Sequence, residues 1–340
     1  MTQGDRLNTD PGREVVDAIQ LSVIVPCFNE EEVLPEFHRR MTLACQTARL
    51  EAYEILYVND GSNDGTLRLM RDLQQQDGCV GVVDLARNFG HQIALSAGLV
   101  HARGALVLVI DADLQDPPEL LEPMMGKIEA GADVVYAQRN KRNGESAFKQ
   151  ATAFLFYRLL GRVGGTPIPV DTGDFRLMTR RVVDILISMP EAHRFVRGLV
   201  SWIGLEQVPI GYDRDVRFAG QTKYPFFKMF AFSLDAITAF ATAPLRIVFL
   251  VSVLAMGLSV ALMGWTIYSF FFLGAVPGWS SGMATFLFFT SVQLFSLAFI
   301  GEYVGRTFME SKRRPLYLIR AFTAPKLWPV PMREMHERGL

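Results

Sequence analysis

The sequence has few cysteines and almost no net charge. Its three cysteines, Cys27, Cys45 and Cys79, are far apart and form no CxxC or Cys/His metal pattern, which indicates core thiols in a reducing compartment. The 34 lysine and arginine residues nearly balance the 35 aspartate and glutamate residues, so no overall basic field indicates nucleic-acid binding. Neither a disulfide-stapled domain nor a nucleic-acid partner is therefore expected.

Two further patterns are missing. The sequence contains neither a GxGxxG nor a GxxxxGK[ST] loop, so a bound phosphate would need a metal ion or basic side chains instead of a glycine-rich turn. Residues 1–20 lack the apolar core of a signal peptide, and we expect a flexible polar tail there without a cleaved signal.

Charge is absent from one long stretch. Residues 247–301 contain no Asp, Glu, Lys, Arg or His. Because one crossing of a membrane needs about 20 apolar residues, this stretch predicts two transmembrane helices, at residues 245–273 and 284–303, joined by a short turn. A buried hairpin in a soluble protein is the alternative, although such a hairpin rarely lacks charge over this length.

Basic residues flank this stretch on one side only. Arg246 precedes it, Arg306 and residues 312–314 follow it, and the predicted turn carries no charge. The positive-inside rule then places both termini and the N-terminal region in the cytoplasm, with a two-helix hairpin at residues 245–308 in the cytoplasmic membrane. Residues 309–340 are expected to form a basic cytoplasmic tail.

Residues 21–222 alternate between strand and helix patterns. Short apolar runs rich in β-branched residues are each followed by an amphipathic helical pattern, which predicts an α/β fold with a mostly parallel sheet covered on both faces. The four predicted strands lie at residues 21–26, 53–60, 80–86 and 105–112.

The segment at residues 223–244 has a different composition. It is rich in Phe and Ala and contains only Lys228 and Asp235 as charged residues inside it. We expect amphipathic helices in the membrane interface there. Helices packed on the soluble domain are the alternative.

Polar side chains gather where the predicted strands end, which is where ligands of parallel α/β sheets bind. Asn29 and Glu30 follow the first strand, and Asp60 follows the second. A carboxylate in such a place can accept hydrogen bonds from a base or a ribose. Each residue taken alone could be an ordinary turn or helix cap, but together they favour a nucleotide site.

The fourth strand runs directly into the sequence DADLQD. Oxygens from Asp111, Asp113 and Gln115 suit Mg²⁺ or Mn²⁺, which commonly bridge to phosphates and can stabilise a departing diphosphate. A phosphatase of the haloacid dehalogenase type would have Thr or Val where Gln115 stands. An EF-hand would have glycine where Asp116 stands, and an EF-hand that began at Asp60 would end on Arg71 instead of Glu.

Several segments occur in an order typical of one enzyme family: LSVIVPCFNEEE, VNDGSNDGT, ARNFGHQ, DADLQDPPEL, DTGDFRLMTRRVVD, FVRGLVSWIG, RFAGQTKY and GEYVGRTFMESKRRPLY. From about residue 21 to residue 319 the sequence resembles the polyprenyl-phosphate glycosyltransferases of glycosyltransferase family 2, of which the bactoprenol glucosyltransferases are nearer than the dolichol-phosphate mannose synthases. The resemblance implies a Rossmann-like GT-A fold and the inverting, metal-dependent transfer of a sugar from a nucleotide diphosphate to a lipid phosphate. A homotetramer is also implied.

The resemblance assigns roles by position. Asp111, Asp113 and Gln115 match the metal and diphosphate site, and Asp174 matches the acidic position considered as base or sugar-orienting group, with Asp171 as a further catalytic candidate. The residues assigned to the nucleotide sugar are Pro26, Phe28, Asn29, Glu30, Val58, Asp60, Asp111, Ala112, Asp113, Arg217 and Lys223. Asp113 is counted among the catalytic residues as well.

Four basic residues are candidates for the lipid phosphate: Arg139, Lys149, Arg194 and Arg197. A phosphate monoester is largely anionic at neutral pH, because its second pKa is about 6, so it needs positioning donors more than a strong base. Arginine suits this role because its planar fork binds phosphate through two parallel bonds. For Arg194 and Arg197, a purely structural or solvated role is the alternative.

The donor stays open at this stage. UDP-glucose is the first choice by resemblance, and GDP-mannose or another UDP-sugar is the alternative. A catalytically silent membrane-anchored subunit is a different class of function, but such a subunit often loses its acidic site residues, and they are present here. A lipid flippase is disfavoured by the absence of charge within the two predicted spans.

Replacing Asp111 or Asp113 with alanine is expected to abolish sugar transfer while the protein stays folded and membrane-bound, because each substitution removes an oxygen ligand from the predicted metal site. Transfer activity and membrane fractionation of both variants would test this. Substantial activity of both variants in the presence of a chelator would rule the metal site out.

Overall fold

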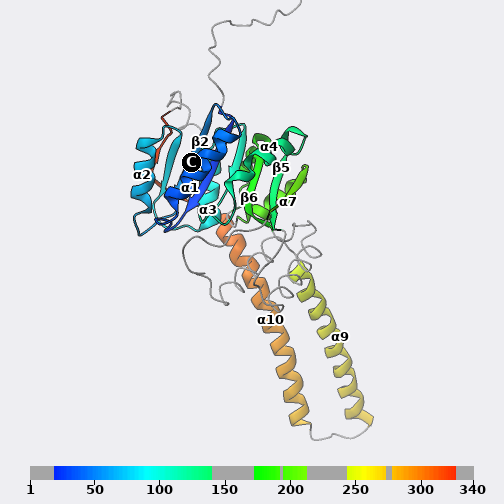
Figure 1. Cartoon of the computed structure of the whole chain (residues 1–340). Coiled ribbons are helices and arrows are strands. Elements are labelled where there is room, and N and C mark those ends of the chain that lie inside the picture. Colours follow the sequence, from blue (N-terminus) through cyan, green and yellow to red (C-terminus); the bar gives the residue numbers. More distant parts are fainter. Residues whose placement is uncertain (1–18, 140–171, 192–193, 213–242, 273–277, 327–340) are drawn as a thin grey trace, which may run out of the picture.

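The structure is a computed structural model with an α/β domain and two long helices that extend away from it (Figure 1). It describes residues 19–139, 172–191, 194–212, 243–272 and 278–326. The predicted interfacial segment, residues 223–244, and the predicted N-terminal tail therefore lie almost entirely outside the described residues.

The described part of the α/β domain contains one eight-stranded sheet of order β7-β5-β6-β4-β1-β2-β3-β8. The strands β1 to β4 pair in parallel, as do β5 and β7, whereas β6 and β8 run antiparallel to their neighbours. The strands are β1 (Leu21–Cys27), β2 (Tyr53–Asn59), β3 (Val80–Leu85), β4 (Leu106–Val109), β5 (Val134–Arg139), β6 (Thr172–Thr179), β7 (Gln207–Tyr212) and β8 (Ile319–Thr323).

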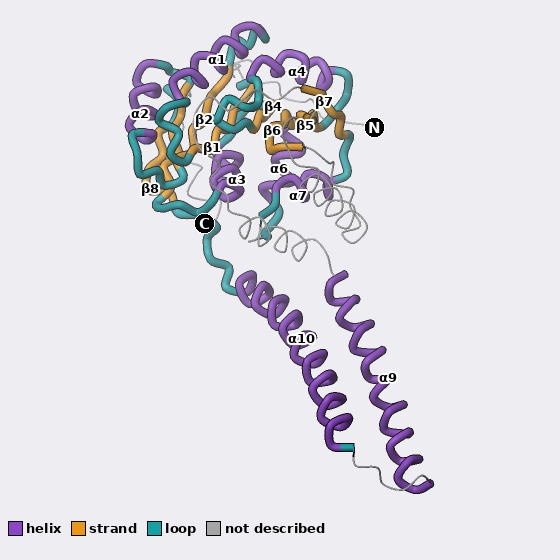
Figure 2. The backbone as a smooth tube through the Cα atoms, turned by 60° about the horizontal axis from the view of Figure 1, so that its bottom comes forward, coloured by secondary structure: helices purple, strands orange, loops and turns teal. Residues whose placement is uncertain are grey.

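Helices cover both faces of this sheet (Figure 2). One face carries α1 (Leu34–Thr47), α2 (Thr66–Gln76) and α4 (Leu121–Glu129), the last preceded by the short 3₁₀ helix η1 (Pro118–Leu120). The other face carries α3 (His91–His101), α6 (Arg180–Ser188) and α7 (Val196–Ile203).

Alternation along the strands divides the core into two layers. Val23 and Val25 of β1 belong to the cluster that contains α1 and α4, and Ile24 between them belongs to the cluster that contains α3, α6 and α7. All three side chains are fully buried. Apolar residues at successive positions are what a strand needs when both of its faces are covered.

The predicted α/β fold with a mostly parallel sheet is confirmed. Strands were predicted at residues 21–26, 53–60 and 80–86, and β1 to β3 agree with these bounds within a residue. The fourth strand was predicted to extend to residue 112, but β4 ends at Val109. The chain turns away beyond it, with Leu114 in the left-handed region at φ 58°.

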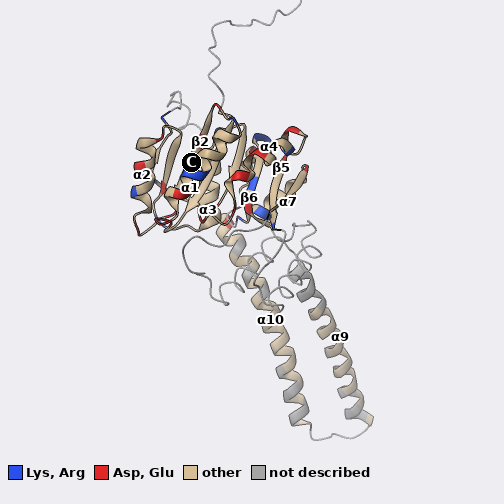
Figure 3. Cartoon of the chain, viewed as in Figure 1, with Lys and Arg blue, Asp and Glu red and all other residues tan. Residues whose placement is uncertain are grey.

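Two long helices stand where the transmembrane hairpin was predicted: α9 (Ala243–Phe272) and α10 (Trp279–Ser311). They run side by side away from the domain, and Figure 3 shows the Lys, Arg, Asp and Glu colours gathered on the α/β domain. Among the described residues, only Phe288–Ser311 is long and apolar enough to cross a membrane, and Val251–Leu262 is a shorter apolar helical stretch. The structure thus supports one candidate span and leaves the second crossing unconfirmed.

Helix α10 continues well past Tyr303, where the predicted second helix ended. The predicted span was placed over the charge-free stretch and the two residues after it, but charge does not end a helix by itself. Here the helix ends at Ser311, followed by Arg313 in the left-handed region at φ 46° and by Pro315.

The region predicted as a basic tail, residues 309–340, differs in part from that prediction. Within it, Ile319–Thr323 forms β8 and pairs with β3 as an edge strand of the eight-stranded sheet. Ile319 and Phe322 pack on the buried cluster beside α3, and this apolar packing explains why the segment returns to the domain.

Helix α3 lies unusually close to the sheet at Gly98. A Cβ atom at this position would meet the Cγ2 atom of Ile24 at 2.3 Å and that of Val58 at 3.1 Å. Both neighbours are fully buried, so neither can move aside easily. The absence of a side chain therefore sets the distance between α3 and the strands β1 and β2.

Gly98→Ala should lower the free energy of unfolding by about 1–2 kcal/mol, because overpacking in a dense core outweighs the gain in helix propensity, which is about 1 kcal/mol. Gly126→Ala in α4 is the matched control, since a Cβ there meets nothing within 4 Å. It should be neutral or stabilising in the same denaturant titration. A Gly98→Ala protein as stable as the Gly126→Ala protein would contradict this account of α3.

Candidate functional site

One edge of the sheet collects most of the predicted site residues. Strands β1 to β5 and β7 all end at this edge, and the antiparallel strand β6 begins there. Val109 at the end of β4 pairs with Arg176 of β6, which places Asp111 and Asp174 at the same edge, where both lie near His91. The two acidic residues come from segments far apart in the sequence, and the pairing of β4 with β6 brings these segments together.

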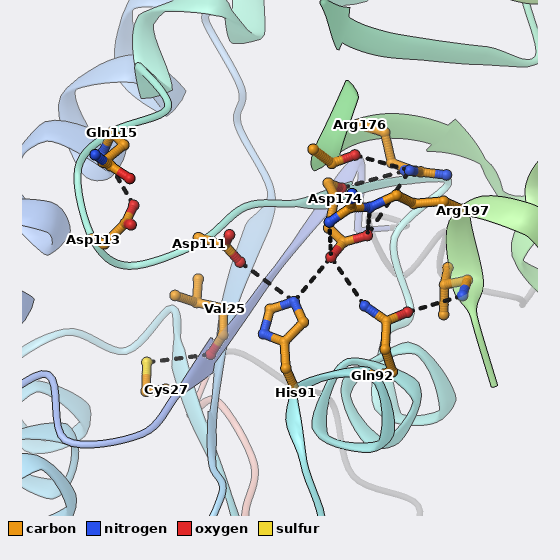
Figure 4. A network of polar contacts seen from close by, with 12 residues as sticks. Val25, Cys27, His91, Gln92, Asp111, Asp113, Gln115, Asp174, Arg176 and Arg197 are labelled. Carbon is orange, nitrogen blue, oxygen red and sulfur yellow. Dashed lines mark hydrogen bonds and ion pairs between the residues drawn. The ribbon is translucent and has the colours of Figure 1, made fainter. Parts of the chain in front are cut away.

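Asp174 is the centre of a polar network at this edge (Figure 4). Its carboxylate accepts hydrogen bonds from Arg197 Nε at 2.8 Å, Arg197 Nη2 at 3.1 Å and Gln92 Nε2 at 3.0 Å. His91 Nε2 lies 3.1 Å from Asp174 Oδ2 and 3.6 Å from Asp111 Oδ1. Only 3% of the Asp174 side chain is exposed, so this network holds a buried charge.

The charges of this network are mutually dependent. Burial alone would raise the pKa of Asp174, but Arg197 and His91 hold that pKa well below its usual range. Burial alone would lower the pKa of His91, but Asp111 and Asp174 raise it to about 9. At neutral pH, His91 is therefore an imidazolium that bridges two acidic groups.

Asp111 is the less stabilised of the two carboxyl groups. Burial raises the pKa of Asp111 to about 6, against the opposing effect of His91, and the nearby Asp174 contributes to the increase. Its Oδ1 atom is buried and accepts no hydrogen bond. A buried carboxylate oxygen without a hydrogen bond is suited to bind a cation.

The other predicted metal ligands lie in the turn that follows. Asp113 Oδ1 accepts a hydrogen bond from the Gln115 backbone amide at 3.1 Å, and Figure 4 shows this pair apart from Asp111. Among the described residues, no three His, Cys, Asp or Glu side chains form a metal-binding group. A hard cation here would take its remaining ligands from the Gln115 amide, from phosphate or from water, and the residues present fit that requirement.

The residues predicted to contact a nucleotide form the adjoining loops. Asn29 Oδ1 accepts the Asn63 amide at 2.8 Å, the Asn29 amide donates to Ser62 Oγ at 3.1 Å, and the Glu30 amide donates to Thr66 Oγ1 at 2.9 Å. These bonds join the β1–α1 loop to the β2–α2 loop.

Asp60 holds the start of α3 in place. Its carboxylate accepts the backbone amides of Phe89 at 2.7 Å and Gly90 at 2.9 Å. Burial raises the pKa of Asp60, while these two hydrogen bonds oppose the increase. The side chains of Pro26, Val58 and Ala112 are buried, whereas Phe28 is partly exposed.

Arg139, a predicted phosphate ligand, ends β5 at the same edge. Its Nε atom donates to the Tyr212 hydroxyl at 3.3 Å, and that hydroxyl donates to the buried Asp116. A Cβ on Gly173 would lie 3.3 Å from Arg139 Nη2, so the glycine leaves room for the guanidinium. This arrangement directs Arg139 toward the start of β6.

Two other predicted phosphate ligands have bonds within the protein. Besides its bonds to Asp174, Arg197 donates to the carbonyl of Thr172 at 3.1 Å. Arg194 donates to the carbonyls of Leu186 at 2.8 Å and Met189 at 2.5 Å, and so caps the end of α6. Binding of a lipid phosphate by either residue stays a prediction.

Four predicted site residues lie outside the described residues: Lys149, Asp171, Arg217 and Lys223. Conversely, His91, Gln92, Asp116, Arg176 and Tyr212 belong to the site but were given no role from the sequence. The segment ARNFGHQ follows the third predicted strand, so its polar residues could have indicated His91 and Gln92 in the same way as those after the first, second and fourth strands.

Comparisons with known proteins show the family to which the sequence is similar. Residues 22–186 match the family described as Glycosyl transferase family 2, and residues 243–307 match the GtrB C-terminal hairpin. The chain is 46% identical over 303 residues to the uncharacterized glycosyltransferase YkcC of Bacillus subtilis (strain 168), a match that covers 89% of this chain and 94% of that protein.

Two relatives have more specific names. The chain is 38% identical to the prophage bactoprenol glucosyl transferase homolog of Escherichia coli (strain K12), with 89% of this chain and 99% of that protein covered. It is also 38% identical to the bactoprenol glucosyl transferase of Shigella phage SfV, with 89% and 98% covered. Among solved structures, glucosyl-3-phosphoglycerate synthase from Mycobacterium tuberculosis matches with a TM-score of 0.46 at 22% identity, over 64% of this chain and 76% of that one.

Asp174→Asn should lower the free energy of unfolding by about 3 kcal/mol at neutral pH, because it leaves Arg197 without its buried partner charge and His91 with Asp111 alone. The pKa of Asp174 is lower in the folded protein than in the unfolded chain. Its contribution is therefore fully present above the unfolded pKa of about 3.9 and is lost as the pH falls through the folded pKa.

Unfolding titrations of wild type and Asp174→Asn between pH 3 and pH 7 would measure this difference. Asp184→Asn is the control, since Asp184 pairs with Arg180 at an exposed position and should contribute less than about 1 kcal/mol. A wild-type advantage that stays constant down to pH 3 would show that the charge of Asp174 is not the cause.

Proposed function

The chain belongs to glycosyltransferase family 2, and we propose that this glycosyltransferase moves a sugar from a nucleotide-diphosphate sugar to the phosphate of a membrane polyprenyl phosphate. The donor proposed first is UDP-glucose, and the acceptor is of the undecaprenyl-phosphate type. The names of two relatives, which describe glucosyl transfer to bactoprenol, support this choice. GDP-mannose or another UDP-sugar is the alternative donor.

One observation carries the proposal: the edge with Asp111 and Asp174 is also the edge at which the chain returns from the long helices. Strand β8 begins at this edge because it runs antiparallel to β3, and only residues 312–318 separate it from the end of α10. At about 3.5 Å per residue, the eight steps from Ser311 to Ile319 keep the end of α10 within about 28 Å of the start of β8 at this edge. A lipid acceptor held beside these helices would therefore be close to the site.

The described residues favour positioning over proton abstraction. The acceptor phosphate is already anionic at neutral pH, so it can attack the anomeric carbon without a strong base. A catalytic base works best when its pKa is near the operating pH, whereas the pKa of Asp174 is held far below it. Asp174 is therefore proposed to orient the sugar and to fix His91 and Arg197 around it.

Asp111, Asp113 and Gln115 would hold Mg²⁺ or Mn²⁺, which when bound would neutralise the diphosphate as it leaves. Arg139, at the end of β5, is proposed to bind the phosphate of the lipid acceptor. Attack from the face opposite the leaving diphosphate would invert the anomeric centre. Lys149, Asp171, Arg217 and Lys223 keep their predicted roles as proposals.

The membrane arrangement is part of the same proposal. Helices α9 and α10 would cross the cytoplasmic membrane as a two-helix hairpin, residues 223–244 would lie in the interface, and the catalytic domain and both termini would be cytoplasmic. The match of residues 243–307 to the GtrB C-terminal hairpin supports this arrangement. Removal of a long isoprenoid from the bilayer would cost about 0.8 kcal/mol per CH₂ group, so the enzyme is expected to act at the membrane surface. The homotetramer implied by the family resemblance is part of the proposal.

A donor screen tests the proposed function. The full-length protein in lipid nanodiscs is incubated with a short polyprenyl phosphate and, in turn, UDP-glucose, UDP-galactose, a UDP-N-acetyl sugar and GDP-mannose. We expect UDP release with UDP-glucose, a product lipid heavier by one hexosyl group, and a β-linkage by NMR. Chelation should stop the reaction, and Mg²⁺ or Mn²⁺ should restore it.

The outcomes of this screen are distinct. Turnover with a different donor would correct the sugar and keep the reaction class. Nucleotide release without a modified lipid would move the acceptor away from polyprenyl phosphate. The absence of turnover and of nucleotide binding with every donor would overturn the proposed function.

A further inference from the structure

Residues 312–326, which follow α10, return to the α/β domain and pack beside β3. We call them the returning segment. Strand β8 pairs with β3 in the antiparallel direction, with Asp84 opposite Ala321 and Leu85 opposite Ile319. A Cβ on Gly81 of β3 would lie 2.8 Å from Pro325, so the returning segment packs against the strand without a gap. Figure 2 shows β8 at the end of the sheet beside α2.

Arg320 of β8 contacts Asp84, the last residue but one of β3, and Ala86, the first residue after β3. Its Nη2 atom donates to the Ala86 carbonyl at 2.7 Å, and its Nη1 atom lies 3.6 Å from Asp84 Oδ2. The Ala86 amide donates to the Leu318 carbonyl at 2.8 Å. The returning segment therefore binds Ala86 through both its amide and its carbonyl.

Ala86 is the first residue of the loop that leads to His91. Farther along, the loop is held by Asp60 through the amides of Phe89 and Gly90. Gly61 makes a close approach, since a Cβ there would meet the Asn88 nitrogen at 2.5 Å. Residues 86–91 are thus fixed between the β2–α2 loop on one side and β8 on the other.

Asp84, the second partner of Arg320, connects it to the loops of the predicted nucleotide site through hydrogen bonds. Only 2% of its side chain is exposed, and its Oδ1 atom accepts Asn59 Nδ2 at 2.7 Å. Asn59 Oδ1 in turn accepts the Ser62 amide at 3.1 Å, and Ser62 Oγ accepts the Asn29 amide. Asp84 Oδ2 accepts no hydrogen bond and has Arg320 and Arg71 as cationic neighbours.

We propose that Arg320 is a positioning residue for the nucleotide sugar. From β8, it holds both residues 86–91, the segment that leads to His91, and the buried side chain of Asp84. These two contacts order the loops that bear Asp60 and Asn29. The inference rests on the proposed function. It gives the returning segment a role in binding the donor, in addition to its place in the sheet.

The test uses the full-length protein in nanodiscs and measures the KM for donor and for lipid acceptor separately, with nucleotide affinity by calorimetry. Arg320→Ala should raise the donor KM and weaken UDP binding about fivefold, since a charged hydrogen bond at a half-exposed position is lost. The acceptor KM should stay within about twofold. Arg320→Lys keeps a cation that can reach one of the two partners and should recover part of the loss.

Lys326→Ala is the matched control. Lys326 lies on the same returning segment and donates to the Gln75 carbonyl at 2.8 Å, away from residues 86–91. It should match wild type in both KM values, and all variants are compared at equal folded fraction by thermal unfolding.

An unchanged donor KM for Arg320→Ala, or equal increases in both KM values, would overturn the positioning role. If wild type transfers no sugar, the proposed reaction fails, and the UDP affinities of the Arg320 variants still decide the role of Arg320.

Discussion

The site depends on one buried carboxylate, Asp174, and on the cations that neutralise it. The partners come from separate parts of the chain: His91 and Gln92 from α3, Arg197 from α7, and Arg176 from the same strand, with Nη2 at 4.0 Å. A charge buried to this degree is tolerated only when such partners surround it. The ionised state of Asp174 therefore fixes the relative positions of α3, α7 and β6.

Helix α3 connects the Asp174 network to the other residues at this edge of the sheet. Its first residue bridges Asp111 and Asp174, Gly98 lets it lie against β1 and β2, and Asp60 binds the amides at its start. The β2–α2 loop with Asp60 and the turn with Asp111 are consequently held in place by one helix, α3. In a site whose proposed chemistry is mainly the alignment of two anionic groups, such rigidity is worth more than any single acid or base.

Much of the fold could be predicted from the sequence, because strands buried on both faces must be continuously apolar and helices between them must be amphipathic. β1 to β3 follow from this pattern. The antiparallel course of β6 does not, since its local sequence carries no information about its partners β4 and β5. β8 was missed because a short, partly exposed edge strand next to basic residues has the composition of a tail.

The site was predictable to the extent that its residues carry unusual chemistry at strand ends. Asp111, Asp113 and Asp60 stood out as carboxylates after apolar runs, and Asp174 emerged only from the family resemblance. His91 lies between two carboxylates that come from segments far apart in the sequence, and no local pattern reveals such a contact. Arg194 and Arg197 were recognised as basic, but their bonds to carbonyls and to Asp174 depend on the tertiary structure.

The extension of α10 beyond the apolar stretch has a mechanical consequence. The charge-free sequence ends at residue 301, yet the helix continues to Ser311, which at 1.5 Å per residue adds about 15 Å of rod. The headgroup layer on one side of a bilayer is only about half as thick. In the proposed membrane arrangement, this stretch of helix would set the height of the site edge above the bilayer, and the proposed polyprenyl phosphate would have to raise its phosphate to reach it. The enzyme would then recognise the phosphate headgroup and the first few carbons of the acceptor, and the remainder of the isoprenoid would act as a flexible tether in the bilayer.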